Sequence, residues 1–341
     1  MNKNIIKYKI NNEDYRVTFC SDKEAADIAE DLKRLASDKK MLLVIDSNIN
    51  KKILSPLFQD LSKSGFSIRI MYVDGSKKNK NLKLMLKILD KLISNGFTKR
   101  SVVLSCGGGV IGDVTALASS LYLRGTIYYH IPTTMTAMVD SCIGGKTGIN
   151  YKDIINSVGN YYHPKNVFIS KNIINLLPKR EFFAGIPEIV KIGLIDNKKI
   201  LNLVENNFNK IIKRDFTFLA KIISLTLKAK IKFFKNDVYE KSTRLKLNFG
   251  HTFAHSIEMS IKSKEDELLR HGEAVGLGML CELYYHDGFS KKYQHLKKVL
   301  KKFNLPIQLN KFVKKEKKDF IKNQIYKFLF LDKKKLLFTQ D

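Results

Sequence analysis

The residues whose side chains are most able to bind a metal or catalyse a reaction are three histidines and a glutamate in the second half of the chain. In LNFGHTFAHSIE, His251 and His255 are four residues apart, so both lie on one face of a predicted helix. Paired imidazoles are typical of a metal site, but the His-Glu-x-x-His arrangement of metalloproteases is absent, so an acidic ligand must come from elsewhere. His271 in RHGEAVGLGM and Glu188 in GIPEIVKIGLI lie on two further predicted helices. A Glu/His/His site with an open position suits Lewis-acid chemistry, whereas a structural role is the alternative for each histidine alone.

A glycine-rich segment, SVVLSCGGGVIGDVTAL, has the composition of a phosphate-binding turn. Gly107, Gly109 and Gly112 form a G-x-G-x-x-G arrangement directly after a predicted strand and at the start of a predicted helix. Glycines let the backbone approach a pyrophosphate, and the helix N-terminus supplies free N–H groups. Unlike the usual dinucleotide-binding motif, this one lies outside the first strand-helix turn, and Asp113 follows its last glycine directly. The segment predicts dinucleotide binding, with a simple tight turn as the alternative.

A third stretch, HIPTTMTAMVDSCIGGKTGIN, crowds small, polar and charged side chains together. Within it, Gly144 and Gly145 directly precede Lys146. A lysine can bind a phosphate or carboxylate as a point charge, and glycines permit close approach of the anion. The stretch predicts an anion-binding loop, with a solvated turn as the alternative.

The elements that must position these motifs divide the chain into two halves. Short apolar runs in the first half predict strands, and amphipathic segments of helical length, such as 81–95, lie between them. The predicted strands are 41–46, 67–73, 101–106, 126–131 and 166–170. Alternating strands and helices predict a parallel sheet with helices on its faces.

Beyond about residue 172 the pattern becomes helical. The predicted helices are 181–195, 198–213, 216–235, 249–262, 271–286 and 290–303. We therefore expect an α/β plus all-α fold. Residues 1–172 would form a Rossmann-like, parallel-sheet domain, and residues 173–341 a mostly α-helical metal- and substrate-binding domain, with the active site in the cleft between them.

Composition narrows the class of protein further. The formal charge of +28 is spread along the 341 residues rather than gathered in one basic stripe, so we expect no nucleic-acid partner. No stretch approaches the roughly 20 apolar residues of a membrane-spanning helix, and MNKNIIKYKI lacks a secretory cleavage pattern. The four cysteines are scattered, which favours reduced thiols. The expected location is the cytoplasm, without a membrane partner.

Six segments together resemble one known family. In order and spacing, GGGVIGD, PTT, VDSCIGGKTGIN, GIPEIVKIGLI, LNFGHTFAHSIE and HGEAVGLGM are similar to the 3-dehydroquinate synthase family, from about residue 40 to residue 335. The resemblance implies a divalent metal, Zn²⁺ or Co²⁺, held by Glu188, His251 and His271. It implies NAD bound by Asp46, Asp74, Gly75, Gly107, Gly108, Gly109, Gly112, Asp113, Thr133, Thr134 and Lys146.

The resemblance also implies a substrate site and a reaction. Its residues would be Arg124, Asp140, Lys146, Asn156, Lys191, Lys230, Arg244, Asn248, His255 and either Lys333 or Lys334. These cations fit a substrate with both phosphate and carboxylate groups. The implied enzyme is a phosphate lyase that converts 3-deoxy-D-arabino-heptulosonate 7-phosphate to 3-dehydroquinate in the shikimate pathway, by transient oxidation, phosphate elimination, re-reduction and aldol closure. A homodimer is expected.

Two departures from the family pattern concern the cofactor. Ile155 in INYKDIINSVG stands where the family has a cofactor-contacting lysine, and the family's Asp-Gly-Glu-x-x-Lys turn reads DGSKKNK, with Ser76 and Asn79 in place of the acidic and basic members. Lys152 and Lys80 are the candidates to supply the missing charge. These departures predict weaker NAD binding.

Three alternatives remain on the sequence alone. One is another sugar-phosphate cyclase, such as a deoxy-inosose or valiolone synthase, although Asn156, Lys230, Arg244 and Asn248 keep the dehydroquinate-type pattern. Another is a metal-dependent glycerol or alcohol dehydrogenase, against which the phosphate-binding cations argue. The last is a decayed enzyme acting as a basic binding protein, which the retained metal ligands disfavour.

Overall fold

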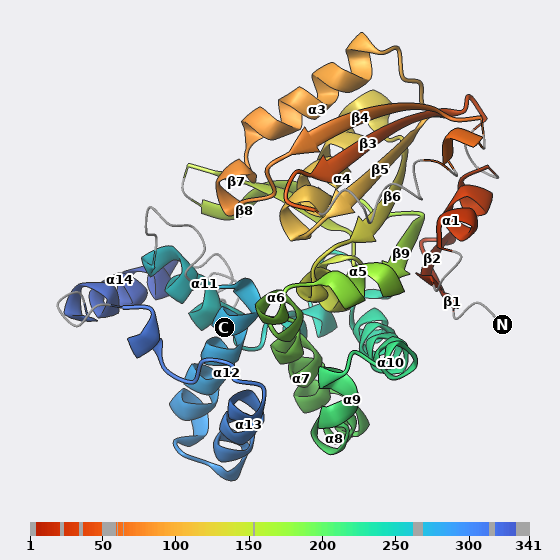
Figure 1. The fold of residues 1–341 in the computed structure, drawn as a ribbon. Coiled ribbons are helices and arrows are strands. Elements are labelled where there is room, and N and C mark those ends of the chain that lie inside the picture. Colours follow the sequence, from red (N-terminus) through yellow and green to blue (C-terminus); the bar gives the residue numbers. More distant parts are fainter. Residues whose placement is uncertain are drawn as a thin grey trace.

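The computed structural model describes residues 5–20, 24–33, 37–49, 59, 61–63, 65–152, 154–261, 269–313 and 318–331. A seven-stranded sheet runs from the top of Figure 1, where β3, β4, β5 and β6 lie, to its middle, where β9, β2 and β1 lie, with strand order β1-β2-β9-β6-β5-β3-β4. Its strands are β1 (Ile5–Ile10), β2 (Glu13–Cys20), β3 (Lys40–Asp46), β4 (Ser67–Val73), β5 (Val102–Gly107), β6 (Ile127–Pro132) and β9 (Asn166–Ser170). The five strands predicted from the sequence are thereby confirmed.

The sheet is mostly parallel but not wholly so. β1 and β2 pair antiparallel at one edge, and β2 then pairs parallel with β9. Neither strand was predicted from the sequence, although Ile6, Tyr8 and Ile10 of β1 alternate with exposed neighbours and are buried. That alternation is the ordinary signal of a strand with one covered face.

Each central strand contributes to two apolar cores, because successive side chains point to opposite faces of the sheet. In β3, Leu42 and Val44 pack with α3 (Leu82–Ser94) and α4 (Gly109–Leu121). Met41, Leu43 and Ile45 face the other way, into a core shared with the helical half of the chain. Burial on both faces explains why these strands read as continuous apolar runs.

A hairpin lies beside the sheet where the sequence predicted an anion-binding loop. Residues Ala137–Ser141 form a turn of π-helix, and Lys146 is the first residue of β7 (Lys146–Tyr151), which pairs with β8 (Ile154–Tyr161). The loop prediction was therefore wrong for the end of the stretch. The backbone groups of the segment that follows Gly144 and Gly145 form hydrogen bonds with β8 instead of with solvent.

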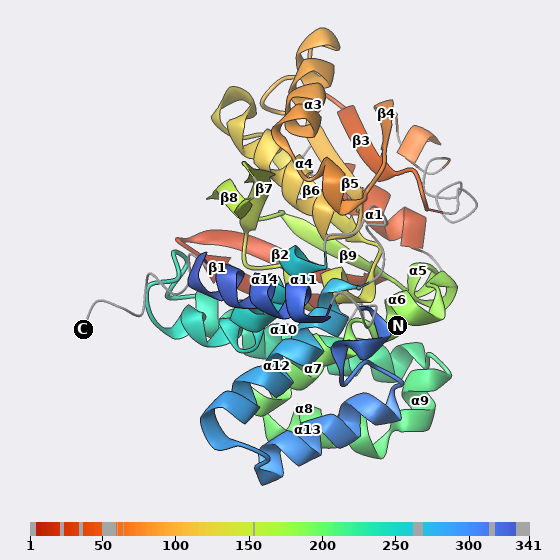
Figure 2. The ribbon, with the colours of Figure 1, turned by 90° about the vertical axis from the view of Figure 1, so that its left-hand side faces the viewer.

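Helices form the lower half of both views (Figures 1 and 2). Those that bear on the site are α7 (Ile186–Ile195), α10 (Phe216–Phe234), α11 (His251–Ser260) and α12 (His271–Asp287). The remaining helices are α1 (Glu24–Lys33), α5 (Lys171–Leu176), α6 (Lys179–Phe183), α8 (Lys198–Asn206), α9 (Phe208–Ile212), α13 (Lys291–Lys302) and α14 (Lys318–Leu331). The predicted helical half is confirmed, with α5 and α14 as additions. Among the described helices, none is long and apolar enough to cross a membrane.

Candidate metal and cofactor site

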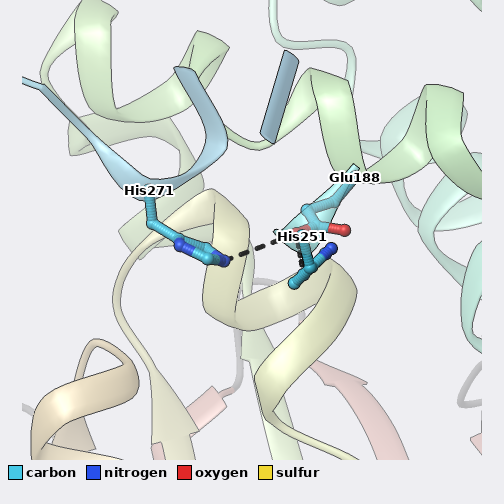
Figure 3. Close-up of side chains that lie close together, drawn as sticks. All are labelled: Glu188, His251 and His271. Carbon is cyan, nitrogen blue, oxygen red and sulfur yellow. Dashed lines mark ion pairs between the residues drawn. The ribbon is translucent and has the colours of Figure 1, made fainter. Parts of the chain in front are cut away.

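Glu188, His251 and His271 come together from three different helices (Figure 3). Their ligand-type atoms all lie within 4.8 Å of one another. Glu188 Oε1 is 3.6 Å from His251 Nε2 and 3.7 Å from His271 Nε2. These distances are too long for hydrogen bonds but fit three donors around one ion, since each metal–ligand bond is about 2.0–2.2 Å.

The burial of Glu188 supports the same interpretation. Its side chain is 1% exposed, and its Oε1 accepts no hydrogen bond from the described residues. A buried carboxylate oxygen without a hydrogen bond is costly unless a cation completes it. The donor set of one carboxylate and two imidazoles suits Zn²⁺ with an open coordination position.

Two glycines bring the ligand-bearing helices together. Gly250, directly before α11, has a φ of +78°, which favours glycine, and a Cβ there would lie 2.8 Å from the backbone nitrogen of Met279 on α12. A Cβ on Gly278 would lie 2.0 Å from the carbonyl oxygen of Gly250. The glycines of LNFGHTFAHSIE and HGEAVGLGM therefore allow α11 and α12 to pack at backbone contact, with His251 and His271 at adjacent helix starts.

Buried cations adjoin this cluster. Lys191, one turn after Glu188 on α7, is 1% exposed, and its Nζ lies 2.6 Å from Glu188 Oε2 and 4.0 Å from Asp140 Oδ1. Burial acts to lower the pKa of Lys191, but the two carboxylates outweigh it, and the pKa is raised. Lys230 Nζ on α10 is 2.7 Å from Asp140 Oδ1. Burial acts to raise the pKa of Asp140, but Lys230 and Lys191 outweigh this effect and hold that pKa well below its ordinary value.

A second set of predicted substrate residues surrounds a carboxylate that the sequence analysis missed. Glu240 Oε1 lies 2.5 Å from Lys146 Nζ and accepts a hydrogen bond of 3.0 Å from the Asn248 amide. Arg244 is 2% exposed and donates to the carbonyl oxygens of Gly144 and Val238, both at 2.7 Å. Glu240 lies in no recognised motif, so only the folded chain identifies it as a member of this cluster.

His255 completes a group of three imidazoles. Its ring centroid lies 5.7 Å from that of His251 and 6.2 Å from that of His271. Glu258, another residue absent from the sequence predictions, is one turn further along α11, with its Oε2 3.1 Å from His271 Nδ1. Despite burial, His271 and Lys77 hold the pKa of Glu258 well below its ordinary value, and the pKa of His271 is raised by Glu258 against the effect of burial. Helical spacing from His251 to Glu258 was the available signal.

The predicted cofactor residues follow the carboxyl ends of neighbouring strands, where open α/β sheets bind ligands. Asp46 ends β3, and its Oδ1 accepts from the Gly75 backbone nitrogen at 3.4 Å; Gly75 lies shortly after β4. Asp74 accepts hydrogen bonds from the Ser76 hydroxyl at 2.9 Å and the Asn79 amide at 3.0 Å. Ser76 and Asn79, the two departures from the family turn, thus fix Asp74.

The glycine-rich turn follows β5, beside the point where the strand order reverses between β3 and β5. Gly108 caps α4, Gly109 is its first residue, and Gly112 lies within it against His130. A Cβ on Gly107 would lie 2.5 Å from Ile111, so this position also needs glycine. The turn, its strand and its helix are as predicted.

Three further predicted residues lie around this turn. The Thr133 backbone nitrogen donates to the Gly107 carbonyl oxygen at 3.0 Å, and Thr134 lies against Gly108. A small cavity is lined by Asp113, Ser141 and Lys146 among others, which places the turn next to the start of β7. Burial raises the pKa of Asp113, although Lys80 opposes the shift.

Lys80 is the cation that the structure brings to Asp113. Its Nζ lies 2.5 Å from Asp113 Oδ2 and donates to Asn156 Oδ1, also at 2.5 Å. Asn156 is the residue directly after Ile155, where the family lysine is missing. Lys152, the other candidate, has its Nζ over the Tyr151 ring instead.

One predicted residue is not brought to the cluster, and another lies outside the described residues. Arg124 is exposed and precedes the amino end of β6. It is about 20 Å along α4 from the glycine-rich turn, which follows the carboxyl end of β5, so the two lie at opposite ends of the strands. The prediction that Arg124 joins this site is not met within one chain. Lys333 and Lys334 lie outside the described residues.

The fold is shared with solved structures of a valiolone synthase and of glycerol dehydrogenases. The solved structure of 2-epi-5-epi-valiolone synthase from Streptomyces hygroscopicus subsp. jinggangensis, with NAD⁺ and Zn²⁺ bound, superposes with a TM-score of 0.82 at 24% identity, over 96% of this chain and 89% of that one. Glycerol dehydrogenase from Schizosaccharomyces pombe shares the fold more distantly, with a TM-score of 0.62 at 17% identity, over 91% of this chain and 81% of that one.

Sequence comparison is more specific than fold. The 3-dehydroquinate synthase N-terminal family model matches residues 70–184, and the C-terminal one matches residues 185–335. The 3-dehydroquinate synthase of Dictyoglomus thermophilum is 39% identical over 76% of this chain and 78% of its own length. That of Prochlorococcus marinus strain MIT 9312 is 33% identical over 93% and 88%. The chain belongs to the 3-dehydroquinate synthase family.

Proposed function

We propose that this protein is an NAD- and divalent-metal-dependent phosphate lyase that converts 3-deoxy-D-arabino-heptulosonate 7-phosphate to 3-dehydroquinate and phosphate. The observation that carries the proposal is the meeting of a Glu/His/His cluster with buried lysines and a glycine-rich turn. Glu188, His251 and His271 would hold Zn²⁺ or Co²⁺. NAD would lie along the carboxyl ends of β3 to β6, between Asp46 and Thr134.

When bound, NAD would supply transient oxidation of the sugar, and the metal would supply Lewis acidity at the oxidised carbon's oxygen. The chain's own residues would bind and orient the anionic groups. Lys191 and Lys230 are almost fully buried beside Asp140, so their charges are little screened. A substrate carboxylate or phosphate placed among them would therefore bind strongly.

His255 is the residue best placed to move a proton. Its ring lies beside both metal-ligand imidazoles, but it is not a member of the Glu188/His251/His271 cluster. An imidazole can both take and return a proton. The phosphate of the substrate could serve as the base for its own elimination, so His255 is assigned a relay role only.

The test is phosphate release from 3-deoxy-D-arabino-heptulosonate 7-phosphate by the purified protein, with and without NAD and with and without a chelator. The proposal expects release that requires both NAD and metal, with no net NADH. Net NADH from glycerol or other alcohols would favour a dehydrogenase. Turnover of a different sugar phosphate would favour another cyclase, and silence with all of them a decayed enzyme.

Two further parts of the proposal concern the setting of the enzyme. A homodimer is proposed from the family resemblance, and sedimentation equilibrium would measure it directly. A cytoplasmic location is proposed from the scattered cysteines, of which Cys20, Cys106 and Cys142 are buried thiols. Fractionation of the source cells would test that location.

A further inference from the structure

Glu258 makes contacts that set it apart from the three metal-ligand candidates. It lies on α11 with a side chain that is 8% exposed. Its Oε2 is 3.1 Å from His271 Nδ1, and its Oε1 is 2.7 Å from Lys77 Nζ. Both carboxylate oxygens are therefore engaged, and the one that reaches the cluster meets His271 at Nδ1, the ring nitrogen on the far side from Glu188.

The contact of Glu258 with His271 Nδ1 determines which ring nitrogen of His271 carries the lone pair that can bind a metal. A carboxylate only accepts hydrogen bonds, so the contact with Glu258 requires a proton on His271 Nδ1. In the neutral ring this leaves the lone pair on Nε2, the atom 3.7 Å from Glu188 Oε1. His251 is arranged alike, with Nδ1 3.2 Å from the carbonyl oxygen of Phe249 and Nε2 towards Glu188. Figure 3 shows both rings directed at the glutamate.

Lys77 connects this arrangement to the other half of the chain. It lies in the turn 74–80, whose Asp74 and Gly75 are predicted cofactor residues, and it reaches across to α11. Because Lys77 occupies Oε1, the Glu258 carboxylate has one orientation in which both oxygens are satisfied. That orientation directs Oε2 at His271.

We infer that Glu258 is a positioning residue for the metal site, which fixes the ring orientation and tautomer of His271 so that Nε2 is presented as a ligand. The inference rests on the metal site of the proposed function. Carboxylates behind ligand histidines strengthen metal binding, and their loss typically lowers metal affinity about 10- to 100-fold.

The experiment measures zinc affinity of the metal-free protein by competition with a chromophoric chelator, without NAD or substrate. Glu258→Gln removes the charge with little change of shape, and Glu258→Leu removes both acceptors. The matched control is Glu282→Gln on α12. In the described part of the chain its carboxylate accepts a hydrogen bond from the Gly250 backbone nitrogen at 2.6 Å and makes no ion pair with either ligand imidazole. Thermal melting of each metal-free variant checks folding, so Glu258→Gln decides the matter if Glu258→Leu does not fold.

The inference expects a loss of zinc affinity of about 10- to 100-fold for Glu258→Gln and less than about threefold for Glu282→Gln. The visible absorption spectrum of the Co²⁺-loaded protein should change in the Glu258 variants and not in the control, because it reports ligand geometry. Wild-type affinity and an unchanged cobalt spectrum in Glu258→Gln would overturn the inference alone. If the wild type and Glu188→Gln bound zinc equally poorly, the metal site would fall, and the inference with it.

Discussion

Replacing Lys191 with methionine should separate the roles of charge and metal in the buried centre. The Lys191 Nζ and the Glu188 carboxylate are 2.6 Å apart, and both side chains are 1% exposed. Removing one member of a buried ion pair typically costs about 3–5 kcal/mol, because the remaining charge is left without compensation. Asp140 keeps Lys230 at 2.7 Å, so the cost falls mainly on Glu188. We expect the metal-free variant to lose about 3 kcal/mol of unfolding free energy.

Zinc should reverse much of this loss. A cation held by Glu188 supplies the compensation that Lys191 provides in the metal-free protein, so zinc should stabilise Lys191→Met more than it stabilises the wild type. By linkage, the variant should bind zinc more tightly while its catalytic activity falls. Because the chain has no tryptophan, unfolding in urea is best followed by circular dichroism, with metal-free and zinc-saturated samples compared.

Lys232→Met is the matched control. Its Nζ pairs with Asp196 at 3.1 Å, but the lysine side chain is 65% exposed, so the same substitution should cost less than about 1 kcal/mol. If metal-free Lys191→Met unfolded at the same urea concentration as this control, Lys191 would not be compensating Glu188. A stability gap that zinc did not narrow would refute the linkage argument independently.

Three other predictions follow from the site. Lys80→Met should weaken NAD binding about tenfold, because a charged hydrogen bond at Asp113 is lost, and Ile155→Lys should restore NAD binding in that background. Calorimetry with NAD measures both effects, and an unchanged NAD affinity in Lys80→Met would exclude a role of Lys80 in cofactor binding. Asp237 has a pKa lowered to about 2 from 3.8 by backbone and side-chain N–H and O–H donors, which outweigh the opposing effect of burial. Its contribution to stability is therefore present above about pH 4 and lost as the pH falls towards 2, so the wild type's advantage over Asp237→Asn in urea unfolding should shrink between pH 5 and pH 3; a constant difference would contradict this. Gly278→Ala should lower the unfolding free energy by about 1–3 kcal/mol or more and weaken zinc binding, because its Cβ would lie 2.0 Å from the Gly250 carbonyl oxygen; a fully stable variant with wild-type zinc affinity would show that close helix packing is not required.

The sequence predicted those parts of the fold that depend on local periodicity. The runs that became β3, β5, β6 and β9 are largely apolar because both faces of the sheet are covered at these strands, whereas the edge strand β4 is mostly exposed. The edge strand β1 and its neighbour β2 were missed although β1 alternates, and Lys146 was placed in a loop although it begins β7. Strand pairing in both cases joins segments by main-chain hydrogen bonds that side-chain pattern specifies weakly.

The sequence indicated a Glu/His/His site from residue type and helical context, and the family resemblance selected Glu188, His251 and His271 as its members. The structure brings the ligand-type atoms of all three within 4.8 Å of one another. The glycine-rich turn after β5 was likewise predicted with its strand and helix. These features are legible in the sequence because each depends on a few neighbouring residues whose types are tightly restricted by geometry.

The contacts between distant segments were decided only by the tertiary structure. Glu258 lies behind His271 because α11 and α12 pack at glycine contact, and Lys77 reaches it from 181 residues away. Glu240 contacts both Lys146 and Asn248. Lys80 contacts Asp113, in a protein that has Ile155 in place of the family's cofactor-contacting lysine. Charge compensation depends on distance in space, which residue spacing along the chain does not determine. The sequence by itself indicated which groups could carry the chemistry. The folded chain determined which of these groups lie within hydrogen-bond or ion-pair distance of one another.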